Sequence, residues 1–266
     1  MAELVDALES ESSEATHGGS SPLSHTKKGD YFMKKAYLLL TLPLLLTGCF
    51  STSVKKDKFQ AVVQEAEKNV ALDSSKLDDV RIHNKLSVDL YNYKEGEFYS
   101  YRYFALILIV PISHGEYTWK EDGKYYYAET FTDSKKNKTG EITEEEFKTR
   151  MAAHRLTIYQ KLNEPLNDAD KILNDNYDEG YTVENYKMSK EFLGSSYSLK
   201  AEISHLESDY SSGEEVKVKK TSTHTIKIKN GLPNTYTSKT DDSETKWTYE
   251  FGKASFSNPN NPSQDE

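Results

Sequence analysis

A short apolar run near the start of the chain limits which residues can form a core. Ala36–Leu46 contains seven leucines and follows two lysines, Lys34 and Lys35. The run is shorter than the roughly 20 residues that a membrane-spanning helix needs. Its leucines would also point to every side of a helix, whereas a helix that packs on a core is apolar along one stripe. We therefore expect the fold to be built from later residues.

The residues that follow the run give it a role. Leu46-Thr47-Gly48-Cys49 matches a lipobox, and Met33–Cys49 resembles a bacterial lipoprotein signal peptide. The resemblance implies cleavage between Gly48 and Cys49 and lipidation of the Cys49 thiol, which then belongs to the mature N-terminus. The expected segments are a signal peptide at 33–48, a lipidated tether at 49–57, a single α+β domain at 58–254 and a disordered tail at 255–266.

The 32 residues before Met33 are predicted to be a spurious extension, because a signal peptide must be N-terminal to be read. Met1–Leu8 resembles the conceptual translation of a leucine-type transfer RNA gene, and Gly19-Ser20-Ser21-Pro22 fits its T-arm. Lys28-Gly29-Asp30 can be encoded by a ribosome-binding sequence just upstream of Met33. A disordered, serine-rich tail is the alternative interpretation of these residues.

Charge and cysteine content argue against several kinds of partner and against disulfide bonds. Residues 1–48 hold 4 Lys/Arg and 6 Asp/Glu, so the remaining 218 residues carry 30 basic and 37 acidic side chains, a net charge of −7. This balance argues against nucleic acid as a partner, and against adhesion to anionic lipid through a basic face. Cys49 is the only cysteine, so no intramolecular disulfide can form and packing must supply the stability.

Two stretches have the apolar spacing of helices. Phe59, Val62, Val63, Ala66 and Val70 predict an amphipathic helix over Lys56–Leu72. Thr143 and Glu146 form a capping box before a second helix over Glu144–Asn163, whose apolar face includes His154. Pro165 is typical of a first helical turn, which predicts a further helix to about Asn174.

Strands are predicted where the apolar period changes to two. Phe98–Ile112 is expected to be one central strand buried on both faces, followed by a turn at Pro111–Gly115. A hairpin is expected across Glu121-Asp122-Gly123. Tyr181–Phe251 has the pattern of a meander with turns at Asn230-Gly231 and Thr240–Ser243. One of its strands is expected to have an apolar face toward the core, formed by Val216, Val218, Ile226 and Ile228. Its other face is expected to be exposed to solvent and carries Lys217, Lys219, Thr221, Thr223, Thr225, Lys227 and Lys229. Ser74–His83 and Asp133–Gly140 are expected to be loops. The fold class is α+β, a mainly antiparallel meander packed against two or three helices.

No motif indicates catalysis or a bound cofactor. The five histidines after Cys49 lack metal-ligand spacing, and His154 is expected to be a packed core residue: His83, His114, His154, His205 and His224. No GxSxG or SxxK element follows Cys49, so the chain is predicted not to be an enzyme. Asn174–Gly180 has oxygen side chains at alternate positions, as calcium loops do, but its glycine is one place late and Asn185 stands where glutamate is required. A helix exit ending at Gly180 is the preferred interpretation, and no metal is predicted.

Two functional classes remain. The first is a non-enzymatic lipoprotein of the cell envelope whose domain is a binding or structural module at the membrane surface. The second is a periplasmic carrier of an apolar ligand, whose expected layout resembles periplasmic lipoprotein-carrier families in architecture only. Tyr91–Tyr103 and Tyr117–Tyr127 could form an aromatic platform for a glycan or an acyl chain, or could simply cover the sheet.

Location and partners follow from the lipid. The membrane is contacted through lipidated Cys49, and an envelope protein, a glycan or a lipid is the further partner. Phe50 rather than Asp after Cys49 implies the outer membrane, facing the periplasm, under the sorting rule of enteric-like Gram-negative bacteria. In a Gram-positive organism the same anchor implies the outer face of the plasma membrane.

Overall fold

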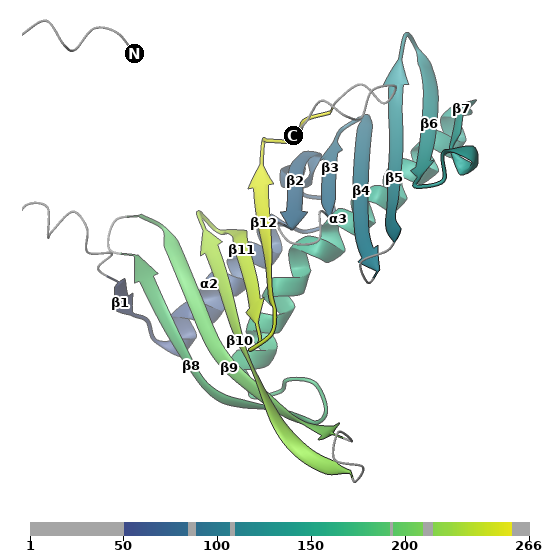
Figure 1. Ribbon diagram of the computed structural model, residues 1–266. Helices are drawn as coiled ribbons and strands as arrows, with labels where there is room; N and C mark the ends of the chain where they lie inside the picture. The colour runs from purple at the N-terminus through teal and green to yellow at the C-terminus, as the bar shows by residue number, and fades with distance from the viewer. Residues whose placement is uncertain (1–50, 85–88, 107–109, 192–193, 210–214, 257–266) are drawn as a thin grey trace, which may run out of the picture. The chain divides into compact units, whose positions relative to one another are not determined.

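The computed structural model describes residues 51–84, 89–106, 110–191, 194–209 and 215–256 (Figure 1). These residues form an α+β structure in which one antiparallel sheet packs against the helices α2 (Lys56–Asn69) and α3 (Glu144–Leu173). Neither helix in these ranges has the length and apolar content needed to cross a membrane. The segments predicted at 1–32 and 33–48 lie outside the described residues.

Twelve strands make up the sheet, in the order β1-β8-β9-β10-β11-β12-β2-β3-β4-β5-β6-β7. Their bounds are β1 Ser51–Ser53, β2 Asp79–Asn84, β3 Leu90–Lys94, β4 Glu97–Leu106, β5 Val110–Glu121, β6 Lys124–Phe131, β7 Lys138–Ile142, β8 Tyr181–Glu191, β9 Ser196–Asp209, β10 Val216–Lys229, β11 Leu232–Lys239 and β12 Glu244–Phe251. Two meanders, β2–β7 and β8–β12, are joined where β12 pairs with β2. Two short 3₁₀ helices, Ser75–Asp78 and Ser134–Lys136, complete the described elements.

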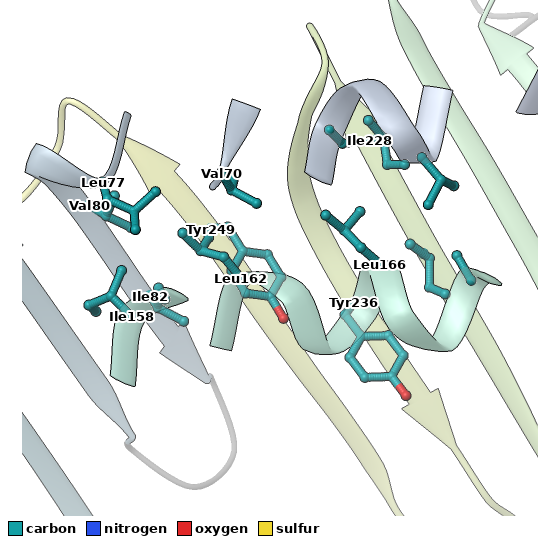
Figure 2. Close-up of a cluster of buried hydrophobic side chains, with 14 of the residues drawn as sticks. Val70, Leu77, Val80, Ile82, Ile158, Leu162, Leu166, Ile228, Tyr236 and Tyr249 are labelled. Carbon is teal, nitrogen blue, oxygen red and sulfur yellow. The ribbon is translucent and has the colours of Figure 1, made fainter. Parts of the chain in front are cut away.

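Both helices cover the same face of the sheet, and the main core lies between them and the strands (Figure 2). Ile158, Leu162 and Leu166 of α3 have no exposed surface, and the side chains of β2 and β10 that face them are equally buried. Each strand alternates between this core face and an outer face, as the period of two requires.

The two helices predicted on either side of Pro165 are one helix of 30 residues, so that prediction was wrong. The helix begins as expected, with the Glu146 amide donating to Thr143 Oγ1 at 3.1 Å. Proline inside a helix costs roughly 3 kcal/mol. Leu166, Ile172 and Leu173 are fully buried beyond it, and burying each such side chain stabilises by roughly 1.5–3 kcal/mol. Core burial therefore outweighs the loss at Pro165.

The single strand predicted over Phe98–Ile112 is also wrong, because β4 and β5 form a hairpin there. Ala105 pairs with Pro111 and Leu106 with Val110, so the expected turn at 111–115 lies inside β5. Residues 107–109, between the two strands, lie outside the described residues, and the stretch contains no Gly, Asn or Asp. Turn chemistry was the only signal that could have divided this apolar run.

Two predicted loops contain regular structure instead. Ser74–His83 forms a 3₁₀ turn and most of β2, where Val80 and Ile82 are buried while Arg81 and His83 lie near Glu250 of β12 on the outer face. The segment was predicted to be a loop because its charged residues outnumber the two apolar residues that alternate with them. Asp133–Gly140 likewise contains the second 3₁₀ turn and the start of β7. Ser51–Ser53, within the expected tether at 49–57, pairs with β8 as β1.

Other predictions are confirmed. Helix α2 occupies most of Lys56–Leu72, and β8–β12 form the expected meander. Ile226 and Ile228 are buried as predicted, but Val216, also expected in the core, is 50% exposed. Asp122 and Gly123 turn the β5–β6 hairpin with φ of 49° and 77°, and Asn230 and Gly231 turn β10 into β11 with φ of 54° and 68°. Positive φ at both central residues is the type I′ geometry that favours Asn-Gly and Asp-Gly.

Candidate functional site

The predicted lipidation site, Cys49, and the predicted cleavage site at Gly48 and Cys49 lie outside the described residues. The described structure begins two residues later, at Ser51. There β1 pairs with the edge of β8, Ser51 opposite Glu191 and Ser53 opposite Ser189. The sheet therefore begins immediately after the proposed attachment point.

His154 is packed in the core, as expected. Its ring stacks on Phe98 with centroids 3.7 Å apart and planes 9° apart, and the Thr118 hydroxyl lies 3.2 Å from Nε2. Burial lowers the pKa of His154 to about 4, and the charge of Arg150 acts in the same direction. The imidazole is neutral at pH 7. Glu116, 3.6 Å away, therefore forms no ion pair with it at that pH.

A chain of hydrogen bonds at the other end of α3 was not foreseen. Tyr236 donates its hydroxyl proton to Asp168 Oδ2 at 2.5 Å, so the tyrosine oxygen accepts from His224 Nδ1 at 3.0 Å. The Nε2 atom of His224 then accepts from the Ser222 hydroxyl at 2.9 Å. The tautomer is assigned from this pattern of donors and acceptors. Four side chains from α3, β10 and β11 thus form one polar network.

Burial dominates the ionisation of this network. It raises the pKa of Asp168, against the opposing effect of the Tyr236 hydrogen bond, and it lowers the pKa of His224. The pKa of Tyr236 lies far above its usual range for the same reason, so the hydroxyl keeps its proton. A neutral His224 that bonds the Ser222 hydroxyl through Nε2 and the Tyr236 hydroxyl through Nδ1 has the arrangement of a base beside a nucleophile.

The location of Ser222 favours a structural interpretation of the network. Ser222 lies inside β10, paired with Ile203 of β9, and not on a sharp turn that would present its hydroxyl to a substrate. His224 and Tyr236 are buried, so each needs hydrogen-bond partners within the protein. The network satisfies them. Its sequence signal, Ser222-x-His224 on one strand face, is too common to be recognised without Tyr236 and Asp168.

Part of the tyrosine-rich stretches forms an aromatic cluster on the outer face of β4, β5 and β6, whereas Tyr91 and Tyr93 belong to the main core. Ring centroids are 4.7 Å apart between Tyr99 and Tyr117, 5.9 Å between Tyr117 and Trp119, and 5.3 Å between Trp119 and Tyr126. Tyr117 and Trp119 are only 6% and 8% exposed, and Phe256 packs against them. The central rings are therefore largely covered, which favours the sheet-covering interpretation over a platform.

A groove of about 710 Å³ lies along α3 and includes Glu67 of α2. The residues along it include the carboxylates of Glu67, Glu164, Asp168 and Asp170 and the ammonium groups of Lys161 and Lys171, while about half of its surface is apolar. Burial raises the pKa of Glu67, and the charge of Asp170 adds to that effect.

The remaining histidines and the calcium-like segment do not come together as a site. His83 lies 3.4 Å from Glu250, His114 contacts Phe131, and His205 contacts Tyr181. Asn174 is the C-terminal cap of α3, and the chain leaves the helix and enters β8 after Gly180. Within the described ranges, no group of three or more His, Cys, Asp or Glu side chains could hold a metal ion.

Comparisons with known proteins leave the family open. No protein-family model matches the chain, and no curated protein matches it. Among solved structures, the DNA polymerase sliding clamp of Pseudomonas aeruginosa has 10% sequence identity and a TM-score of 0.14 over 78% of this chain and 65% of the clamp. The Helicobacter pylori beta clamp bound to a DNA ligase peptide has 9% identity and a TM-score of 0.15 over 82% and 70%. Likeness at this level carries no argument about fold or function.

Proposed function

We propose that the chain is a lipid-anchored lipoprotein of the cell envelope, held by Cys49, whose domain is a non-enzymatic binding or structural module at the membrane surface. The observation that carries the proposal is the lipobox Leu46–Cys49 behind a basic head and a short apolar run. Cleavage before Cys49 would remove none of the described elements, since the first of them starts at Ser51.

The lipid accounts for stable attachment. One acyl chain holds a protein only marginally, whereas two or more anchor it, at roughly 0.8 kcal/mol for each buried methylene. A diacylglyceryl group on Cys49 satisfies this condition without any spanning segment. The domain would sit on the membrane that the sorting signal selects, facing the periplasm in a Gram-negative organism or the exterior in a Gram-positive one.

Incorporation of labelled palmitate tests the anchor. We expect label in the wild-type protein and none in Cys49→Ala, because the thiol is the only attachment point. Cys49→Ala should also remain uncleaved and run larger on a gel. Label that persists in Cys49→Ala, or a wild-type protein that takes up no label, would refute the proposal.

The carrier of an apolar ligand is the less favoured role. Side chains between α3 and the sheet, such as Leu162 and Leu166, are fully buried against their neighbours, and the groove along α3 has charged side chains in its lining. The two roles are distinguished by purifying the protein without its covalent lipid anchor, extracting any bound lipid and identifying that lipid by mass spectrometry. Co-purified lipid in stoichiometric amount would favour the carrier, and its absence would favour the surface module.

A further inference from the structure

The outer face of the β8–β12 meander carries two rows of lysines and hydroxyls. The pairing register places Lys187, Lys200, Thr225, Thr237 and Lys246 across the five strands in one row, and Ser189, Ser198, Lys227, Thr235 and Thr248 in the next. These ten residues, called here the lysine–hydroxyl face, include four lysines, six hydroxyls and no carboxylate. Figure 1 shows the five strands side by side.

The four lysines are exposed, and the nearest carboxylates on the same side of the sheet, Glu202 and Glu244, stand in the adjacent row. Lys187 stands directly opposite Lys200, and like charges in that position destabilise a sheet. Lys227 is the diagonal neighbour of Lys200, within roughly 8 Å. Among the described residues none of the four lysines forms an ion pair. Further along the same strands lysines are paired, for example Lys219 with Glu184 at 2.6 Å. The repulsion is therefore confined to the face.

Negative charge collects on the opposite side of the sheet. The groove along α3 has four carboxylates against two lysines. The groove is net acidic, whereas the lysine–hydroxyl face carries four positive charges, with Glu191, Glu202 and Glu244 on the same side of the sheet beyond its two rows. A surface of anionic groups would attract the lysine–hydroxyl face and repel the groove side. The charges would therefore set the orientation of the domain on that surface as well as its affinity for the surface.

The face also continues to the proposed anchor. Ser53 of β1 pairs with Ser189, so the second row extends onto β1. Ser51 follows Cys49 by two residues, a span of at most about 7 Å in an extended chain. A lipid on Cys49 would hold the edge of this sheet at the headgroups, which gives the face a nearby surface rich in phosphate.

We propose that the lysine–hydroxyl face binds the anionic phospholipid headgroups of the membrane in which the protein is anchored. The ammonium groups of Lys187, Lys200, Lys227 and Lys246 neutralise phosphate, and the serine and threonine hydroxyls between them donate hydrogen bonds to phosphate oxygens. The orientation, although not the lipid affinity itself, rests on the proposed anchor at Cys49. Under this arrangement the helices and their acidic groove face away from the membrane.

Vesicle binding tests the face without the lipid. The full chain carrying Cys49→Ser is mixed at 100 mM salt with vesicles of phosphatidylcholine alone or with one third phosphatidylglycerol, and bound protein is measured by sedimentation. Neutral vesicles report binding through the apolar run at 36–46. We expect the anionic vesicles to bind more strongly. Replacing all four lysines of the face by Gln should weaken binding several-hundredfold, since each contributes roughly fivefold.

A matched variant controls for net charge. Lys58, Lys68, Lys76 and Lys135 are exposed, lie outside the face and form no ion pair within the described structure, so changing them to Gln removes the same charge. This control should lose much less affinity than the face variant. Circular dichroism melts check folding, and the pair Lys187→Gln and Lys200→Gln serves if the fourfold variant fails to fold.

Three results would overturn the inference. They are equal losses in the face and control variants, equal binding of wild-type protein to neutral and anionic vesicles, and binding to soluble polyphosphate without binding to vesicles. Failure of palmitate labelling would refute the anchor alone, because the vesicle assay uses a chain that cannot be lipidated.

Discussion

The buried imidazole of His154 makes stability depend on pH. In the unfolded chain its pKa is about 6.5, whereas burial against Phe98 lowers the pKa to about 4 in the folded protein. Between these values the unfolded chain binds a proton that the folded protein does not. The free energy of unfolding therefore falls as pH drops from about 7 to 4 and changes no further below that, as far as His154 is concerned.

The magnitude follows from the shift. One pKa unit corresponds to about 1.4 kcal/mol, so a difference of about 2.5 units is worth at most roughly 3.4 kcal/mol, of which about 2 kcal/mol is lost by pH 5. His154→Gln can still hydrogen-bond Thr118 but does not titrate. We expect the variant to be less stable at pH 7.5, and to lose about 2 kcal/mol less than wild type between pH 7.5 and pH 5.

Urea unfolding at the two pH values measures this difference, because the other titrating groups, such as Glu116 and His224, are common to both proteins. Nuclear magnetic resonance titration of the His154 ring protons gives the folded pKa directly. Parallel pH dependence in the two proteins, or a ring that titrates near pH 6.5, would show that burial does not control this group.

Three further substitutions test the core, the polar network and the helix cap. Leu166→Ala should destabilise by roughly 2–5 kcal/mol, because Leu166 is fully buried after Pro165; a loss below 1 kcal/mol in urea unfolding would argue against the continuous helix. Tyr236→Phe should cost roughly 1–3 kcal/mol by leaving Asp168 and His224 without their shared partner, whereas Tyr197→Phe, with no hydrogen bond described, should be nearly neutral. Thr143→Ala should cost about 1 kcal/mol and Thr143→Ser very little, since serine keeps the cap to Glu146; equal melting temperatures for the two would contradict this.

Local signals in the sequence predicted the elements whose boundaries are marked by particular residues. The Thr143 cap set the start of α3, and the Asp122-Gly123 and Asn230-Gly231 pairs set two hairpins. Prediction failed where the deciding contact lies far along the chain. Pro165 is held inside a helix by burial of the residues after it, and no local preference reports that contact.

The polar network and the lysine–hydroxyl face depend on register. The sequence showed that Thr225 and Lys227 share one face of a strand. It could not show that Lys200 lies opposite Thr225, or that Lys187 lies opposite Lys200, because cross-strand partners belong to the assembled sheet. In the same way Asp168 joins Tyr236 across 68 residues. Cys49 is therefore the only functional residue predicted from the sequence, because its lipobox consists of consecutive residues.

The proposed face and the prediction from net charge give opposite expectations for anionic lipid, and the dependence of binding on salt concentration distinguishes them. At 0.1 M salt the Debye length is about 10 Å, while a helix layer is itself roughly 10 Å thick, so carboxylates on the far side of α3 are largely screened from a membrane at the lysine–hydroxyl face. At 0.01 M the Debye length is about 30 Å, and the net charge of the full chain, −9, opposes approach to an anionic surface. Binding to anionic vesicles should therefore be strongest near 0.1 M. It should be weaker at 0.01 M, and weaker at 0.5 M because the lysines are then screened as well.

The variant with four Gln on the face should show no such maximum. An affinity for the wild-type protein that falls steadily from 0.01 M upward would mean that the acidic groups do not oppose binding, and that charge is not divided between the two sides of the sheet in the way the register implies.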